Sequence, residues 1–107
     1  MAGSVAWRRG DIPDDVLHAV RGAAGHTAAV FMHQLGWLLA ESGYLVRREV
    51  LVENRGDGHR GRVDLVAERD GCRVAIECDR KTARRKSIMK LGQVPATGRL
   101  VVCREAA

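Results

Sequence analysis

The sequence predicts a single domain that mixes helices and strands (α/β, or more closely α+β). A mixed central sheet should be flanked by helices. Three observations predict it: helical patterns come first, three consecutive strand patterns follow, and a further helix and strand end the chain. No internal repeat and no linker interrupts this order, and 107 residues suit one compact domain. We therefore expect residues 1–107 to fold as one unit.

The first segment, residues 1–11, has no hydrophobic periodicity and is expected to form a loose N-terminal arm. It contains Trp7 followed by two arginines, a combination that can stack on bases and contact phosphates. The same tryptophan could instead anchor the arm by packing back on the domain. Both interpretations stay open for this segment.

Two helices are expected next, at about 13–22 and about 26–42. Pro13 and the two aspartates after it suit a helix start. Gly22 and Gly25 weaken the pattern between the two helices, which could also be fused. The second helix should end at Gly43, because glycine suits the left-handed position that follows a helix.

Three strands should follow. Residues 44–53 are rich in β-formers, and residues 54–59 form a polar, glycine-rich loop. Residues 60–69 and 72–79 alternate between apolar and polar side chains, and Asp70-Gly71 between them strongly favours a two-residue type I′ turn. We therefore predict a β-hairpin at the centre of the domain.

The chain should end with a helix and a strand. The helix is expected from a cap at Thr82 or a neighbour to about Leu91, since Gly92 and Pro95 come next. A short apolar run then predicts a last strand at about 99–104.

The hairpin turn sets the register of its two strands. In that register Asp64 lies directly opposite Glu77, with the two Cβ atoms roughly 4.5–5.5 Å apart. The other face of the hairpin is filled by a continuous set of core residues: Val63, Leu65, Ala67, Val74, Ile76 and Cys78. Two facing carboxylates repel each other, so we expect a cation between them.

Further polar residues follow the third strand. Asp79 should project on the same face as Glu77, and so should Lys81 if the strand continues that far. The same register also sets Arg62 opposite Asp79, so a cross-strand ion pair is an alternative to a metal ligand there. A basic helix comes next, and its cationic residues are candidates for binding DNA phosphates; with Arg62 the set is Arg62, Arg80, Arg84, Arg85, Lys86 and Lys90.

Paired carboxylates suit Mg²⁺ or Mn²⁺, which prefer hard oxygen ligands and retain several waters. Such an ion polarises a phosphate oxygen and lowers the pKa of a bound water. We therefore expect Asp64, Glu77 and Asp79, or the carbonyl of Cys78, to bind the ion. A nearby ammonium, from Lys81, would assist the attacking water.

The element order and the spacing D64-x12-E77-x-D79 resemble the PD-(D/E)XK nuclease superfamily, the restriction-endonuclease-like fold, over about residues 26–104. The resemblance implies an αβββαβ core whose Asp64 and Glu77 bind divalent metal. It implies a metal-dependent endodeoxyribonuclease that needs no small-molecule cofactor.

The chain departs from the family pattern at three places. The last motif position, usually Lys, is Asp79 here, which makes an E-x-D variant; Lys81, or Lys86 on the helix, is the candidate replacement. The proline that usually precedes the first acid is replaced by Val63. The acid that many members carry in the first helix is absent, and His26 is the nearest polar residue.

Two other functions remain open. A non-catalytic nucleic-acid-binding module would keep the fold without a working lysine. A small interaction protein would offer its basic face to an acidic protein. If the chain is a nuclease, its small surface means that specificity must come from a homodimer, a partner or nucleic-acid shape.

Composition agrees with a globular, basic protein. Hydrophobic residues make up 46% of the chain, and 18 Lys+Arg against 13 Asp+Glu leave a net charge of +5, which suits a polyanionic partner. No apolar stretch is long enough to span a bilayer and no signal-type segment begins the chain. The three unclustered cysteines suit reduced thiols. We therefore expect a cytoplasmic location.

Overall fold

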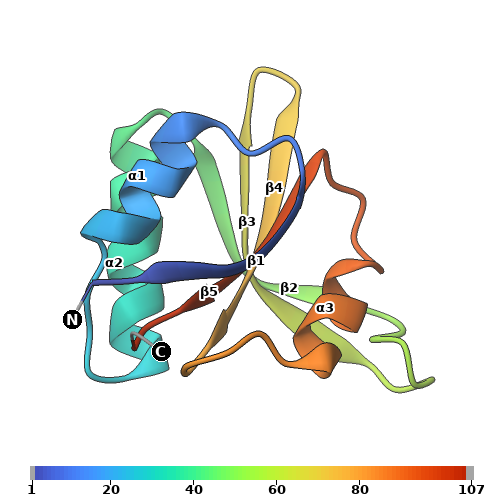
Figure 1. The fold of residues 1–107 in the computed structure, drawn as a ribbon. Coiled ribbons are helices and arrows are strands. Elements are labelled where there is room, and N and C mark those ends of the chain that lie inside the picture. The colour runs from blue at the N-terminus through green and yellow to red at the C-terminus, as the bar shows by residue number, and fades with distance from the viewer. Residues whose placement is uncertain (1, 106–107) are drawn as a thin grey trace.

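The computed structural model describes residues 2–105 and shows a compact α+β domain with a five-stranded mixed sheet and three helices (Figure 1). The elements in chain order are β1 (Ser4–Gly10), α1 (Asp14–Gly22), α2 (Ala28–Glu41), β2 (Leu45–Val52), β3 (Gly61–Arg69), β4 (Cys72–Asp79), α3 (Arg85–Leu91) and β5 (Gly98–Cys103). The mixed sheet flanked by helices is confirmed, and α1 and α2 are separate helices. No helix in the described part of the chain is long and apolar enough to cross a membrane.

The sheet has the strand order β1-β5-β4-β3-β2. Strands β2, β3 and β4 form an antiparallel meander, and β5 returns parallel to β4 after α3. A parallel neighbour needs a crossover connection, and α3 supplies it. From α2 onward the chain therefore runs helix, three strands, helix and strand, in the order that the sequence predicted.

Helices cover both faces of the sheet. Figure 1 shows α1 and α2 on one side and α3 on the other. The core under α1 and α2 is the larger of the two and includes Phe31, Leu35, Leu65 and Ile76. The core under α3 is smaller and includes Leu91. Because apolar side chains of the central strands project to both faces, these strands need cover on both sides.

The central hairpin forms in the predicted register. Glu68 pairs with Arg73 and Leu65 with Ile76, which is the pairing that a turn at Asp70-Gly71 requires. The backbone at both turn residues has positive φ, 50° and 80°, as a type I′ turn demands. Helix α2 also ends as expected, because Gly43 follows it with φ of 91°.

The prediction of a loose N-terminal arm was wrong. Residues 4–10 form β1, an edge strand that pairs antiparallel with β5. Half-buried Trp7 packs against the core under α3, so the packing alternative for this residue is the correct one. The strand was missed because an edge strand depends mainly on backbone hydrogen bonds to its neighbour, and these leave little hydrophobic pattern.

Candidate metal and nucleic-acid site

The candidate site lies where β3 and β4 separate. Backbone pairing between the two strands stops at Leu65 and Ile76. Beyond this pair the lower ends of the strands diverge, with the start of α2 on one side of the opening and α3 on the other (Figure 1). Asp64 and Glu77 are the next residues along each strand, so both acids lie at the point of divergence.

Each carboxylate replaces a missing bond of the sheet. The Asp64 amide donates to Oε2 of Glu77 over 2.8 Å, and the Cys78 amide donates to Oδ2 of Asp64 over 2.8 Å. These reciprocal bonds satisfy backbone groups that the divergence would otherwise leave unpaired. Each acid therefore bonds the backbone of the opposite strand, and no hydrogen bond or ion pair within residues 2–105 joins the two carboxylates.

The cation beside Glu77 is a lysine. Nζ of Lys90, from α3, lies 2.6 Å from Oε1 of Glu77, and the Glu77 side chain is only 3% exposed. Burial raises the pKa of the Glu77 carboxyl to about 7, and the charge of Asp64 adds to the rise. The Lys90 ammonium and the Asp64 amide oppose it. Glu77 is thus poised to gain or lose a proton near neutral pH.

This raised pKa makes stability depend on pH. Between the ordinary value of 4.5 and about 7, folded Glu77 keeps a proton that the unfolded chain has lost. The free energy of unfolding should therefore fall as pH rises through this window, by roughly 3 kcal/mol in total. Glu77→Gln removes the titration. In urea denaturation, the stability of the variant relative to the parent should rise from about pH 5 to about pH 8. A pH-independent difference would contradict the raised pKa.

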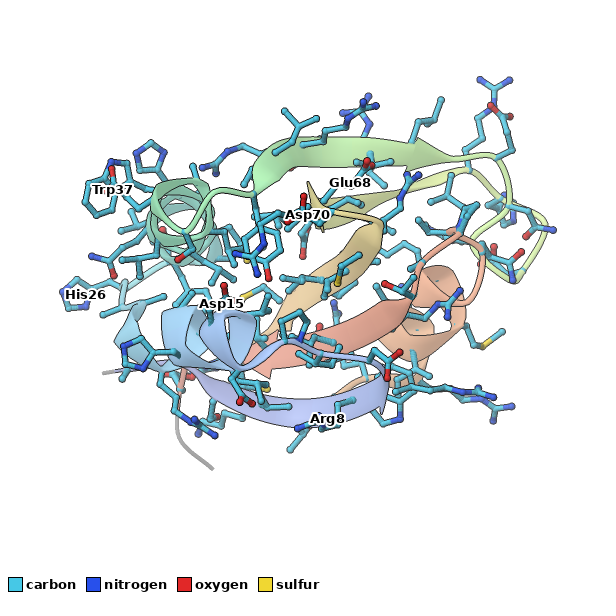
Figure 2. The ribbon with its side chains drawn as sticks, turned by 90° about the horizontal axis from the view of Figure 1, so that it is seen from above. Arg8, Asp15, His26, Trp37, Glu68 and Asp70 are labelled. Carbon is cyan, nitrogen blue, oxygen red and sulfur yellow. The ribbon has the colours of Figure 1, made fainter. Side chains whose placement is uncertain are left out.

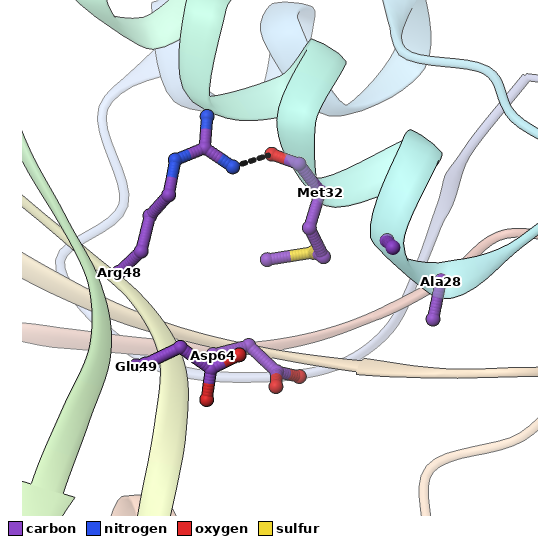
Figure 3. A pocket seen from close by; sticks show the side chains of 6 residues that line it. Ala28, Met32, Arg48, Glu49 and Asp64 are labelled. Atoms are coloured by element: carbon purple, nitrogen blue, oxygen red, sulfur yellow. Dashed lines mark hydrogen bonds between the residues drawn. The ribbon is translucent and has the colours of Figure 1, made fainter.

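Asp64 also lines an open pocket. The pocket has a volume of about 300 Å³ and lies between α2 and the paired strands β2 and β3. Figure 3 shows the carboxylates of Glu49 and Asp64 at its base, opposite α2. Oδ1 of Asp64 accepts none of the hydrogen bonds found among residues 2–105. One oxygen of this acid therefore remains available to a ligand.

Glu49 is a candidate that sequence reasoning missed. It interrupts the pairing of β2 with β3, because Arg48 pairs with Leu65 and Val50 with Val63 while Glu49 is skipped. Its φ of 52° lies in the left-handed region, which costs a non-glycine residue roughly 1 kcal/mol or more. The position of Glu49 beside Asp64 follows from the register of β2 with β3. This register could not be predicted, because the glycine-rich loop between the two strands does not fix it.

Arg48 holds the other wall of the pocket in place. Its guanidinium donates to the carbonyls of Met32 and His33 in α2, over 3.2 and 3.1 Å (Figure 3 shows the first). A Cβ on Gly36 would clash with the Arg48 guanidinium, so this helical glycine makes room for it. Arg48 thereby ties β2 to α2 across the pocket.

Asp79 has a different environment from the one expected. Its carboxylate is buried and accepts hydrogen bonds from the Arg84 amide (2.8 Å), Nε of Arg84 (2.9 Å) and the Ser87 hydroxyl (2.9 Å). It thus binds the amide of Arg84, the residue before α3, and the hydroxyl of Ser87 inside that helix. The alternative pairing with Arg62 was wrong, since Arg62 lies opposite Leu51 of β2 and Asp79 pairs with Arg84. Within residues 2–105, Asp79 forms no hydrogen bond or ion pair with Asp64 or Glu77.

The two lysines proposed to replace the motif lysine, Lys81 and Lys86, do not contact the acids of the site. β4 ends at Asp79, and Lys81 lies exposed in the bend after it, so strand alternation does not direct Lys81 toward the acids. Lys86 is exposed on α3, which begins at Arg85 and so starts later than predicted. The lysine that contacts a carboxylate of the site is Lys90.

The six basic residues expected to bind nucleic acid fall into two groups. Three of them pair with acids of the domain: Arg80 with Glu105, Arg84 with Asp79 and Lys90 with Glu77. The other three, Arg62, Arg85 and Lys86, are exposed and form no ion pair with any described residue. This second group is the one available to phosphates.

The remaining groups add little to a ligand set. His26 projects outward from the start of α2 (Figure 2), and its carbonyl accepts from Arg104. Burial raises the pKa of the Cys78 thiol to about 12, with Asp64 adding to the rise, so it stays protonated. Within residues 2–105, no three His, Cys, Asp or Glu side chains lie close enough together to form a metal site.

Comparison of the chain with protein-family models, with curated proteins and with solved structures finds no match.

Proposed function

We propose that this protein is a metal-dependent endonuclease that hydrolyses phosphodiester bonds in DNA, with Asp64 and Glu77 as the ligands of Mg²⁺ or Mn²⁺. The observation that carries the proposal is the pair of reciprocal carboxylate-to-backbone bonds that holds both acids at the divergence of β3 and β4. Supporting it is the order of helix, three strands, helix and strand, which resembles the core of PD-(D/E)XK nucleases.

A carboxylate pair fits Mg²⁺ because this ion keeps several of its waters and binds proteins through one or two carboxylates. Asp64 has an unengaged oxygen beside an open pocket and would hold the ion together with Glu77, whose carboxylate keeps its contact with the Lys90 ammonium. When bound, the ion supplies an activated water and polarises the phosphate. The buried Glu77 must be deprotonated for this, so binding should strengthen as pH rises through about 7.

Lys90 is the residue we assign to the missing motif lysine. Its ammonium orients the Glu77 carboxylate, and its side chain is 22% exposed, so it reaches both the acid and the surface. An ammonium in this position stabilises the negative charge that develops on a phosphate. Lys81 and Lys86 lack a contact of this kind with either acid.

The exposed cations at the start of α3 are proposed to hold the DNA backbone. Replacing Arg85 and Lys86 together with Ala should reduce the slope of log K against log salt by about 1.8, since each phosphate contact contributes roughly 0.9. Fluorescence anisotropy with a labelled duplex, without divalent metal, measures this slope. Arg21→Ala, in α1 on the other face of the sheet, is the control and should leave the slope unchanged. An unchanged slope in the double variant would move the phosphate contacts elsewhere.

The activity itself is tested with plasmid and branched DNA. We expect nicks or breaks with Mg²⁺ or Mn²⁺ and none with EDTA. Cleavage that persists in EDTA would contradict a metal-dependent site.

A second function, a nucleic-acid-binding module without catalysis, is favoured by one observation. Both oxygens of Glu77 and both oxygens of Asp79 already have partners inside the domain, so neither acid needs a metal. DNA binding without cleavage under any metal condition would support this second function.

A further inference from the structure

Helix α2 carries apolar residues on its exposed face as well as on its buried face. Its sequence, AAVFMHQLGWLLAE, contains a single acidic residue, at its end, and no lysine or arginine. Helices of this kind are normally covered on all sides. One face packs on the sheet through Phe31, Leu35 and Leu39, which are fully buried. The opposite face is exposed, so part of an apolar helix lies at the surface.

The exposed face carries a regular stripe. Val30, His33, Trp37 and Ala40 follow one another at intervals of three, four and three residues, which is the spacing of a helix–helix seam. Val30 is 54% and Trp37 57% exposed, high values for side chains of this kind. Figure 2 shows Trp37 projecting from α2 away from the sheet. We call these four residues the α2 stripe.

We propose that the α2 stripe is the interface of a homodimer, in which α2 packs antiparallel against α2 of a second copy across a two-fold axis. In this register Val30 meets Ala40 of the second copy, and His33 meets Trp37 of the second copy. In each of these pairs a larger side chain packs against a smaller one. The His33 imidazole of one copy lies against the Trp37 indole of the other. The stripe is therefore complementary to itself, as a two-fold interface requires.

The charges favour a second copy over nucleic acid. A polyanion needs cations beside it, and the stripe contains no lysine or arginine. The nearest arginine on the pocket side, Arg48, already donates to carbonyls of α2. The edge strand β2 also exposes apolar residues, Leu45 and Leu51, but charged residues separate them and the left-handed Glu49 interrupts the strand.

The expected dimer is weak. Fourteen residues of helix span about 21 Å, and one helix from each copy buries less than a standard interface of about 1,600 Å². Such an interface should dissociate on dilution. The inference does not depend on nuclease activity, because it is measured without metal or DNA.

Sedimentation of the full chain over a range of concentrations, from about 1 to about 500 µM, tests the interface. The parent should shift from monomer to dimer, and Trp37→Glu should remain a monomer. Leu51→Glu is the matched control, since Leu51 is 56% exposed on β2, and it should dimerise like the parent. A parent that is monomeric throughout would overturn the proposal. So would a dimer lost with Leu51→Glu and kept with Trp37→Glu. If Trp37→Glu instead weakens binding of single-stranded DNA by a parent that does not dimerise, the stripe binds bases.

A cross-link tests the register. Positions 30 and 40 are about 15 Å apart in one helix, too far for an internal disulfide, but they meet between two copies. The double variant V30C/A40C should form a covalent dimer on mild oxidation that V30C alone and the parent do not form. Covalent dimer from V30C alone at the same rate, or none from the double variant of a dimerising protein, would overturn the antiparallel arrangement.

Discussion

Asp79→Ala is expected to lower the free energy of unfolding by roughly 2–4 kcal/mol. The change leaves both the Arg84 amide and the Ser87 hydroxyl, which is 1% exposed, without their acceptor. The ion pair with Arg84 contributes little to this figure, because that guanidinium is 63% exposed. Urea denaturation at neutral pH measures the loss.

The variant Asp79→Asn distinguishes a structural role of Asp79 from a role as a metal ligand. The amide oxygen still accepts a hydrogen bond from α3, so this variant should lose about half as much stability as Asp79→Ala. Its response to Mg²⁺ should equal that of the parent. If Asp79→Asn abolished the response to Mg²⁺ and left the free energy of unfolding unchanged, Asp79 would be a metal ligand and not a structural residue.

Asp64→Asn is expected to abolish stabilisation by Mg²⁺. At about 100 times its dissociation constant, a ligand that binds only the folded state raises the free energy of unfolding by about 2.7 kcal/mol. The variant keeps an oxygen for the Cys78 amide, so it should fold, but it loses the charge that the ion needs. Thermal unfolding with and without Mg²⁺ measures the difference.

A matched control removes effects of net charge. Asp70→Asn makes the same chemical change in the hairpin turn, where Asn-Gly also favours positive φ. This control should respond to Mg²⁺ as the parent does. Equal responses of Asp64→Asn and Asp70→Asn would contradict a metal site at Asp64.

Local signals predicted the central part of the fold. Asp70-Gly71 set the register of β3 and β4, which leaves Asp64 and Glu77 at the same end of the paired region. The turn residues and the alternation act within about ten residues of each other, so the sequence alone carries this information. The order from α2 to β5 followed from patterns of the same short range.

Features that depend on distant contacts were not predictable in this way. β1 exists because β5 offers an edge to pair with, and the paired residues lie 88 to 99 positions apart in the chain. Asp79 was expected to face Arg62, but the two strands diverge before they reach these residues. Its carboxylate instead accepts from the Arg84 amide and the Ser87 hydroxyl, and Lys81 lies in the bend after β4. Glu49 faces Asp64 only through the β2–β3 register.

The initial rate of Mg²⁺-dependent nicking of a supercoiled plasmid tests the central claim most directly, for the parent, Asp64→Asn and Asp70→Asn. We predict that Asp64→Asn slows nicking by roughly 100-fold or more, since even partners outside the metal's own ligands can contribute 10–100-fold. Asp70→Asn should nick at the rate of the parent. Equal rates for the parent and Asp64→Asn would show that the carboxylates between β3 and β4 are not the catalytic site.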